Sequence, residues 1–288
     1  MRHLLTVLML LASAPLFAQE DCDVFNIQEL SAAYLNFSVD TVILQPDGSY
    51  EVQLSNGTTA SITLGCTDPA DANYDPAANT DDGSCASNSC SSIEFDDYTY
   101  SVVEIGDQCW FAENLRTTVY ADGSAIPEVT GNSAWTGLST GARCDYNNNT
   151  ENGDTYGRLY NWYAVDNASG LCPNGWHVPT DGEWTALEDY ITAQGFNGTE
   201  GTALKSTSGW NSGGNGTDDF GFSAFPGGFR RSTGGGFLYA GWYGTWWSSS
   251  PNGGDAWRRY LIYNHPDIIR NFSSPRFGFS VRCLRDAD

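Results

Sequence analysis

Eight cysteines constrain the fold of this chain more than any other feature of its sequence. No two of them form a Cys-x-x-Cys pair, so zinc ribbons and thioredoxin-type redox motifs are not expected. Residues 1–18 are typical of an export signal, because Arg2 precedes an apolar run that is too short to span a bilayer. In an oxidising compartment, an even number of cysteines predicts a framework of disulfides.

Four disulfides are therefore expected, although eight cysteines allow 105 pairings. The pairing that we predict is Cys66–Cys85, Cys109–Cys144 and Cys172–Cys283, which leaves Cys22–Cys90 by elimination.

The charge of the chain limits its partners. With 35 acidic and 13 basic side chains, the formal net charge is −22. Nucleic acid and anionic membranes are not attracted to an acidic surface, so we expect neither as a partner. No segment after residue 18 approaches the roughly 20 apolar residues of a membrane span. We therefore expect a secreted or surface-attached protein.

Composition divides the chain after the signal into three parts. Residues 19–64 predict a small β module, because TVILQPDGSYEVQL alternates around a Pro-Asp-Gly turn. Residues 65–90 form an acidic segment bracketed by cysteines, and residues 91–288 form a domain rich in tryptophan and glycine.

The acidic segment is a candidate calcium site. Hard carboxylate and amide oxygens at short spacings suit Ca²⁺, although the spacing is not that of an EF-hand. The alternative is a solvated acidic linker. The segment also resembles a short cassette that is common between the modules of exported Bacteroidota proteins, which implies a spacer. The candidate ligands are Asp68, Asn73, Asp75, Asp81 and Asp82.

The domain at 91–288 predicts an α+β fold with a few helices among many short strands. The stronger helix starts after Thr180, which forms a capping box with Glu183, and Gly195 closes it. A second, short helix is expected near 157–165. The apolar stripe of the first helix is Trp184, Leu187 and Ile191. Strands are expected at 98–106, 256–264 and 277–284.

Catalytic signatures are weak. GLSTG at 137–141 matches the spacing of a nucleophile elbow around Ser139, but its glycine-rich surroundings predict a loop. His177 is expected to be a buried, hydrogen-bonded residue rather than a base or ligand. Metalloprotease, phosphate-loop and dinucleotide-binding motifs are missing from the sequence. We therefore do not expect an enzyme.

Binding has better support in the aromatic and arginine-rich stretch 246–272. In a strand at 256–264, alternation places Trp257 and Arg259 on one side and Arg258 and Tyr260 on the other. Exposed aromatics with arginine are typical of recognition surfaces and of stacking on sugar rings. The alternative is that these aromatics form part of the core.

Residues 93–286 resemble the Fibrobacter succinogenes major paralogous domain, a family of exported, often surface-associated bacterial proteins without an established activity. The motifs that carry the resemblance occur in order and include VVEIGDQCWFAENLR, DTYGRLYNWYAV, LCPNGWHVPTDGEW, WWSSS and GFSVRCLRD.

These motifs are in turn similar to the C-type-lectin-like fold of the formylglycine-generating-enzyme type. HVPTDGEW is similar to that group's R-L-P-T-E-A-E-W, and GFSVRC to its terminal G-F-R-x-x-R. The resemblance implies a twisted antiparallel sheet, two helices and long loops, with the first and last elements adjacent, which suits a Cys172–Cys283 bridge. The copper site of that enzyme has no place here, so its oxidoreductase activity is not carried over.

The segment from Trp246 to Cys283 also resembles the variable region of retroelement-diversified lectin-fold receptors. In those proteins the positions between the fixed motifs form the ligand face. Asn264 and Asn271 are further polar candidates. The ligand contacts that the resemblance implies are Trp257, Arg259, Tyr263, His265, Arg270 and Phe272.

Together these observations predict a secreted or cell-surface, non-catalytic adhesion module that recognises a glycan or another surface ligand. A structural cell-envelope component without a small ligand is the alternative, and an enzyme on the formylglycine-generating scaffold is a third. The only expected cofactor is Ca²⁺ in the acidic loop. Asp218, Asp219 and Asp255 are the candidate ligands for a calcium ion in the lectin-like domain.

Overall fold

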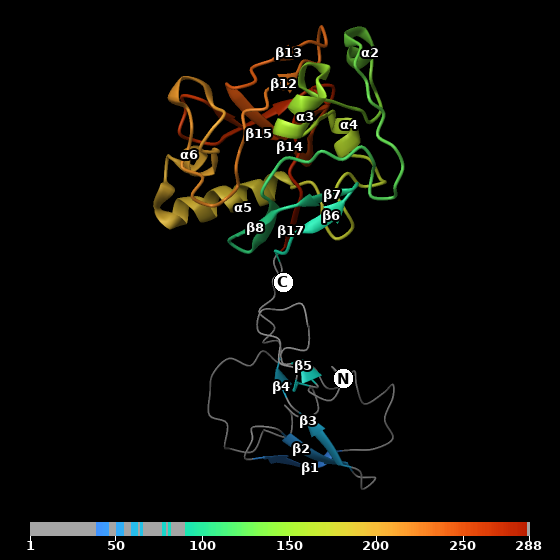
Figure 1. Ribbon diagram of the computed structural model, residues 1–288, viewed down its shortest axis with the longest axis vertical. Helices are drawn as coiled ribbons and strands as arrows, with labels where there is room; N and C mark the ends of the chain where they lie inside the picture. The colour runs from blue at the N-terminus through green and yellow to red at the C-terminus, as the bar shows by residue number, and fades with distance from the viewer. Residues whose placement is uncertain are drawn as a thin grey trace. The chain divides into compact units, whose positions relative to one another are not determined.

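The structure is a computed structural model that describes residues 39–45, 50–54, 59–62, 64–65, 77–78, 80–81 and 90–286. The chain divides into two compact units, Met1–Asn88 and Ser89–Asp288 (Figure 1). The first unit contains an antiparallel three-stranded meander and a short parallel pair. Its strands are β1 (Val39–Leu44), β2 (Tyr50–Leu54), β3 (Thr59–Ile62), β4 (Leu64–Gly65) and β5 (Thr80–Asp81).

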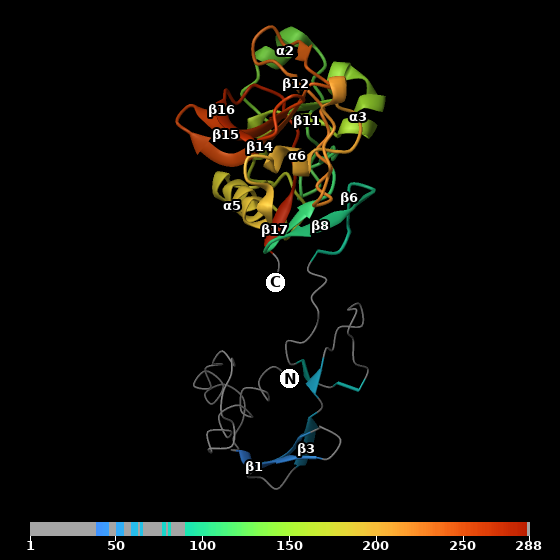
Figure 2. The same cartoon turned by 90° about the vertical axis from the view of Figure 1, so that its left-hand side faces the viewer.

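The second unit begins with two hairpins and ends with a strand that returns to the second of them. Leu284 lies opposite Trp110, so the last strand lies at one edge of the sheet β8-β9-β17 (Figure 2). The start and end of the domain are therefore adjacent. The strands are β6 (Ile93–Phe95), β7 (Tyr98–Tyr100), β8 (Val102–Ile105), β9 (Gln108–Phe111) and β17 (Leu284–Asp286).

The unit is α+β, with helices between the opening hairpins and the C-terminal strands. Two helices were expected, but five α-helices form within 90–286. The additional ones are too short for an amphipathic pattern: among them, the helix at Asn132–Thr136 buries only Trp135. The helices are α2 (Asn132–Thr136), α3 (Thr150–Tyr156), α4 (Trp162–Val165), α5 (Asp181–Ile191) and α6 (Glu200–Leu204). Single turns form at η2 (Tyr146–Asn148), η3 (Thr192–Phe196) and η4 (Asn211–Gly213).

Helix α5 confirms the predicted capping box. Thr180 Oγ1 accepts a hydrogen bond from Glu183 N at 3.2 Å, and the Glu183 carboxylate accepts one from Thr180 N at 2.6 Å. The helix then continues as the π-helical turn η3, in which Gly195 has φ 100°. The left-handed backbone favours glycine there. The predicted stripe of Trp184, Leu187 and Ile191 is buried.

A three-stranded antiparallel sheet, β14-β15-β16, occupies the C-terminal part. The strand expected at 277–284 is mostly irregular: Gly278 and Phe279 make isolated bridges, and only Leu284 enters a strand. The sheet strands are β14 (Tyr243–Asn252), β15 (Asp255–Ile262) and β16 (Ile269–Ser273). Two-residue ladders join β10 (Arg143–Cys144) to β11 (Leu159–Tyr160) and β12 (Phe229–Arg230) to β13 (Phe237–Leu238).

The two faces of this sheet contribute to different hydrophobic clusters. Trp246 and Leu261 lie in a cluster with Trp184 of α5. Trp247, the next residue along β14, lies in a second cluster with Phe279. Both faces thus contribute to the core.

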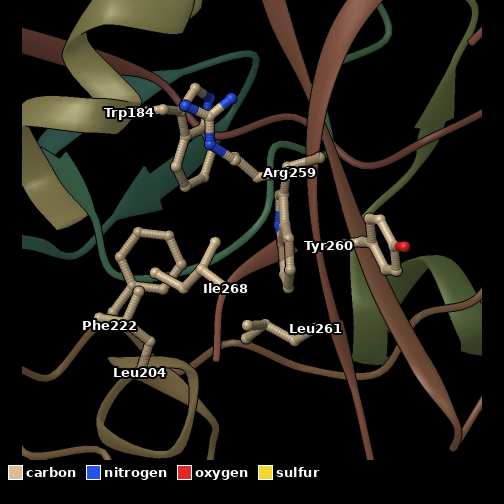
Figure 3. Close-up of a pocket in the computed structure, with 8 residues that line it drawn as sticks. Trp184, Leu204, Phe222, Arg259, Tyr260, Leu261 and Ile268 are labelled. Atoms are coloured by element: carbon tan, nitrogen blue, oxygen red, sulfur yellow. The ribbon is translucent and has the colours of Figure 1, made fainter. Parts of the chain in front are cut away.

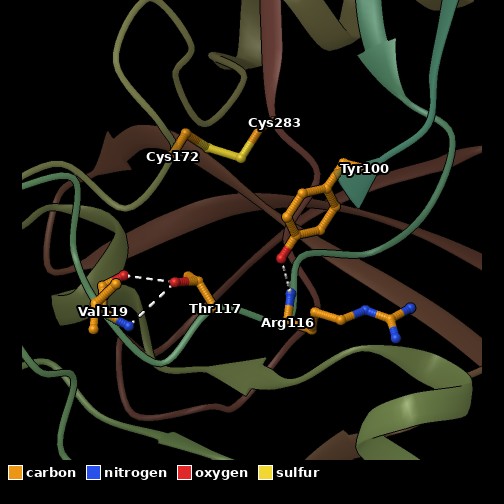
Figure 4. The surroundings of a disulfide bond; sticks show 6 residues. All are labelled: Tyr100, Arg116, Thr117, Val119, Cys172 and Cys283. Carbon is orange, nitrogen blue, oxygen red and sulfur yellow. Dashed lines mark hydrogen bonds between the residues drawn. A yellow bond between two sulfur atoms is a disulfide. The ribbon is translucent and has the colours of Figure 1, made fainter. Parts of the chain in front are cut away.

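Two disulfides form among the described residues. The predicted Cys172–Cys283 bridge is confirmed, with Cα atoms 5.8 Å apart (Figure 4). Cys90 bonds to Cys109, with Cα atoms 5.0 Å apart, so the predicted pairs Cys109–Cys144 and Cys22–Cys90 are wrong. Cys144 is a free, buried thiol. The predicted pair Cys66–Cys85 lies outside the described residues.

Near the Cys172–Cys283 bridge, a buried tyrosine fixes the loop after β9. The hydroxyl of Tyr100 accepts a hydrogen bond from Arg116 N at 3.1 Å, and the Thr117 hydroxyl donates to Val119 O at 2.8 Å (Figure 4). Burial raises the pKa of Tyr100. The hydroxyl is therefore neutral and keeps its proton at physiological pH.

Candidate functional site

The register of β14–β16 places the predicted contact residues. Trp257 lies opposite Phe272, and Arg259 lies opposite Arg270. Residues directly opposite one another share a face of the sheet. These four side chains therefore lie on one face, which packs against α5 at its centre (Figure 2).

Arg259 does not reach the surface of this face. It is 1% exposed, and its guanidinium donates to the Glu188 carboxylate and, at 2.6 Å, to Asp181 Oδ1. Burial raises the pKa of Glu188 although Arg259 opposes that shift. All three guanidinium nitrogens of Arg259 are hydrogen-bonded within the protein. Arg259 is thus an internal cross-link between β15 and α5, and a ligand cannot reach it without opening the core.

Arg270 lies next to Arg259 and uses the same carboxylate. Its Nη2 donates to Asp181 Oδ2 at 2.7 Å and its Nε to Asp181 Oδ1 at 2.9 Å. Burial would raise the pKa of Asp181, but hydrogen bonds from Arg270 and Arg259 outweigh it and lower that pKa. The shared carboxylate stays ionised and bridges two arginines that would otherwise repel one another.

The same ion pair holds Arg270 flat on an aromatic ring. The guanidinium carbon lies 3.5 Å from the ring centroid of Trp257, and the ring of Phe272 meets Trp257 edge-on at 5.8 Å. Phe272 is 49% exposed, and the Arg270 side chain is 45% exposed. We call Trp257, Arg270 and Phe272 the Trp257 corner. Nη1 of Arg270 makes no hydrogen bond to any residue that the structure describes, so it can donate to a ligand.

Tyr263 and His265 follow the C-terminal end of β15. Tyr263 is six positions after Trp257, which corresponds to about 20 Å along an extended strand. The Tyr263 ring packs edge-on against Trp242 at 4.6 Å, and His265 Nδ1 lies 3.5 Å from Asp267 Oδ2. The six predicted contact residues therefore do not form one compact site.

The remaining polar candidates are dispersed. Asn264 and Asn271 are exposed, and the amide oxygen of Asn271 accepts from Phe272 N at 2.8 Å. The Asp218 carboxylate accepts two 2.6 Å hydrogen bonds from Ser223, and Asp219 bonds to a threonine hydroxyl. Asp255 lies at the start of β15.

Within the part of the chain that the structure describes, no group of three or more His, Cys, Asp or Glu side chains is arranged to hold a metal ion. The five candidate calcium ligands of the acidic loop fall outside the side chains described, and only the backbone of Asp81 is placed, in β5.

A cavity of about 10 Å³ lies beneath the same face of the sheet (Figure 3). The Arg259 side chain extends beside the cavity toward Trp184, whereas the ring of Tyr260 points away from the cavity. Because this volume is at most that of one water molecule, the cavity is a packing defect and not a ligand pocket.

Ser139 and His177, the two candidate catalytic residues, do not form a catalytic site together. Ser139 lies in an exposed loop after α2, without the strand-turn-helix setting of a nucleophile elbow. His177 is exposed, contrary to expectation, and its Nε2 lies 2.8 Å from Glu183 Oε1. This contact belongs to the start of α5, where Glu183 also completes the capping box.

Sequence reasoning did not identify Asp181, the carboxylate that organises the Trp257 corner. A signal was present, because an aspartate directly after a capping threonine lies in the first turn of a helix, where negative charge is favoured. Asp181 and Arg270 are 89 residues apart in sequence, so no local pattern indicated their ion pair.

The fold thus defines the class of this protein as an α+β domain that is closed by a disulfide and a terminal strand. The domain carries an arginine–aromatic corner. The chain belongs to the Fibrobacter succinogenes major domain family, whose model matches residues 103–285. No curated protein and no solved structure matches the chain. Among the described residues, no helix is long and apolar enough to cross a membrane.

Proposed function

We propose that this protein is a secreted or cell-surface, non-catalytic binding module that recognises a glycan or another surface ligand through the Trp257 corner. The observation that carries the proposal is the fixed stack of Arg270 on Trp257 beside the exposed ring of Phe272. A cation stacked on an aromatic ring, with an apolar ring beside it, offers both hydrogen bonding and a flat surface to a sugar.

Pre-organisation supports this function. Arg270 is held by Asp181, which is itself held by Arg259 from the core. A ligand that binds here does not have to order the arginine side chain, so it avoids most of that entropic cost. The pairing with Asp181 also cancels much of the arginine charge, which favours ligands with hydroxyl or carbonyl acceptors over strong anions.

We propose a C-type-lectin-like fold for the domain. The adjacency of β17 and β9 supports it, because it joins the two ends of the domain, and the Cys172–Cys283 bridge ties the C-terminal end to the middle of the chain. The disulfides of the described part support an oxidising, extracellular location.

Binding of the purified full chain to a panel of glycans and polysaccharides tests the function. Phe272→Ala and Arg270→Gln should each weaken binding of a panel ligand by about tenfold or more, because both remove a contact at the centre of the corner. Tyr190→Ala is the matched control, since Tyr190 is another exposed aromatic residue and lies on α5.

Equal binding by wild type and both corner variants, with unchanged unfolding temperatures, would overturn the proposed site. Self-association of the protein without binding to any panel ligand would support the structural, cell-envelope alternative instead.

A further inference from the structure

A second aromatic cluster, with one exposed and two partly buried tyrosines, lies on the opposite face of the same sheet. Tyr260 alternates with Arg259 and Leu261 along β15, so its ring points away from α5 (Figure 3). The rings of Tyr243 and Tyr260 are nearly parallel, with centroids 6.1 Å apart, and Tyr239 lies 4.9 Å from Tyr243. The guanidinium of Arg258 lies 4.3 Å from the centroid of Tyr260. We call Tyr239, Tyr243, Tyr260 and Arg258 the tyrosine face.

The backbone beneath this face is fixed. The carbonyl of Tyr239 accepts hydrogen bonds from Trp242 N and Tyr243 N, both at 3.0 Å, and Gly241 N donates to Pro226 O at 2.8 Å. Phe229 packs below, with its ring centroid 5.6 Å from that of Tyr239. A rigid row of rings stacks on a ligand with little loss of conformational entropy.

Tyr239 is held in a conformation that a bulky residue rarely adopts. Its φ is 66°, in the left-handed region, and its side chain is 48% exposed. A strained backbone of this kind costs about 1–3 kcal/mol and is found preferentially at functional sites. The strain does not bury the ring here, because the side chain remains 48% exposed.

Arg258 supplies a cation that the fold leaves without an anion. Its Nε donates to Ser273 Oγ at 2.8 Å, and its cross-strand neighbour is the neutral Asn271. Among the described residues it forms no ion pair, and neither of its Nη groups donates a hydrogen bond. Because burial lowers the pKa of this half-buried arginine, its charged form would gain from an external carboxylate.

The hydroxyl groups of the three tyrosines are also available. None of them makes a hydrogen bond to another residue in the described part of the chain. Each phenol therefore presents both a ring for stacking and a hydroxyl group that can donate to or accept from a sugar hydroxyl.

The charge of the protein is unevenly distributed along its sequence. Residues 220–285 contain eight arginines and only two acidic residues, Asp255 and Asp267, although the whole chain has a net charge of −22. Asp255 alternates onto the Trp257 side of β15, and Asp267 lies beside His265. The segment that contributes the tyrosine face is therefore basic, and the acidic balance of the whole chain does not exclude an anionic ligand there.

We propose that the tyrosine face binds a carboxylated saccharide chain, with sugar rings stacked on the tyrosines and a carboxylate paired with Arg258. Arginine and carboxylate form a charge-assisted, two-point hydrogen-bonded pair that a neutral sugar does not offer. The site is separate from the Trp257 corner, since the two lie on opposite faces of the sheet, and it does not rest on the function proposed for that corner.

The test is calorimetric titration of the full chain with polygalacturonate, in EDTA because calcium cross-links this polymer. The matched ligand is the fully methyl-esterified polymer, which has the same sugar backbone without the charge. We expect binding of the acid form to be about tenfold or more tighter than that of the ester and to weaken with salt. Dextran sulfate should bind more weakly than polygalacturonate.

Two variants locate the site. Arg258→Gln should lower affinity for polygalacturonate by about tenfold or more, and Tyr239→Asn should also lower it while leaving the unfolding temperature unchanged or higher, because asparagine tolerates positive φ. Arg116→Gln is the matched control: Arg116 also stacks on a tyrosine, at 4.0 Å from the Tyr98 centroid, but it is paired with Glu113.

Several outcomes would overturn the inference: no binding of polygalacturonate, equal binding of the ester or of dextran sulfate, or full affinity in Arg258→Gln. The two proposals fail separately. If Phe272→Ala lost binding to polygalacturonate while Arg258→Gln kept it, the ligand would bind at the Trp257 corner and not at the tyrosine face.

Discussion

Buried arginines cross-link the loops of this domain. Arg282 is fully buried, and it donates to Asn114 Oδ1 and Phe111 O at 2.8 Å and to Ser223 O at 2.9 Å. Arg230 donates in the same way to backbone carbonyls, including Thr130 O at 2.8 Å. A planar guanidinium has five donors in a fixed fork and can therefore join more chain segments than an ammonium, which has three donors. This accounts for a chain with one lysine and many arginines.

Replacement of Arg282 by lysine should destabilise the domain by about 3 kcal/mol, because carbonyl groups in the core lose their donors. Urea unfolding followed by tryptophan fluorescence measures this change. Arg276→Lys is the control, since Arg276 is exposed and donates to one carbonyl only. Equal stability of the two variants would contradict the cross-linking role.

Cys144 should be unreactive in the native protein. Burial raises the pKa of its thiol to about 12, so almost no thiolate exists at neutral pH. We expect no modification of Cys144 by a thiol reagent until the protein is unfolded, when one additional thiol reacts relative to Cys144→Ser. Rapid reaction in the native state would contradict the burial and would favour the enzyme alternative.

At the scale of elements, helix α5 links the capping box to the Trp257 corner. Its first turn contains both Glu183, which caps the helix, and Asp181, which binds Arg259 and Arg270. A helix start that shifted by one residue would move Asp181 around the helix axis and away from both arginines. The precision of the corner therefore depends on where α5 begins.

Loss of the cap should weaken the domain. Thr180→Ala should lower the free energy of unfolding by about 1 kcal/mol, because the amide of Glu183 loses its acceptor. Thr155→Ala is a suitable control in helix α3, since Thr155 is exposed and its hydroxyl donates to the carbonyl of Glu151 without capping a backbone amide. Thermal unfolding with an unchanged midpoint in Thr180→Ala would contradict the role of the cap.

Glu183 also makes the stability depend on pH. Burial raises the pKa of Glu183, but hydrogen bonds from His177 and Thr180 outweigh it and lower the pKa from 4.5 to about 2. Since the pKa is lower in the folded state, the stabilisation is fully present above about pH 4.5 and is lost as the pH falls toward 2. Glu183→Gln should remove this part of the acid dependence, as measured by urea unfolding between those values. An identical pH profile for the variant would contradict it.

The acidic loop carries its own prediction from the sequence. If Asp75 and its neighbours hold calcium, Asp75→Asn should weaken calcium binding by the full chain in calorimetric titration, since it removes a charged oxygen ligand. Asp255→Asn is the control, since weaker calcium binding in this variant would place the ion in the lectin-like domain and not in the acidic loop. No heat of calcium binding in the wild type would show that the loop is a solvated linker.

At the scale of the whole domain, the Cys172–Cys283 bridge and the β9–β17 ladder both tie the C-terminal strand to earlier parts of the chain. The bridge joins residues 111 apart in sequence, whereas Cys90–Cys109 spans only 19. Closing the longer loop restricts the unfolded chain more strongly.

The double variant Cys172→Ala/Cys283→Ala should therefore lower the free energy of unfolding by about 4–5 kcal/mol, which is more than the loss from Cys90→Ala/Cys109→Ala. Scanning calorimetry measures both, and each retains the other bridge. A larger loss from the shorter bridge would show that native-state strain, and not chain entropy, dominates.

The sequence by itself determined the local features of this protein. The capping box of α5, the alternation of 256–262 and the motifs of the family are local patterns, and each was identified correctly. Hydrogen bonds between residues three apart and the two-residue period of a strand depend on neighbouring residues alone. Short helices such as α2 were not predicted, because they bury too few side chains to produce an amphipathic pattern.

Only the tertiary structure decided which arginine of β15 is buried and which cysteines form disulfides. Alternation separates Arg259 from Arg258, but the packing of α5, with Asp181 and Glu188, places Arg259 in the core. Arg258 lies on the opposite face, where no carboxylate of the described residues pairs with it. Cys90 bonds to Cys109 because the fold brings their Cα atoms within 5.0 Å. Such distances between remote segments are set by the packing of the whole domain, and spacing along the chain does not contain them.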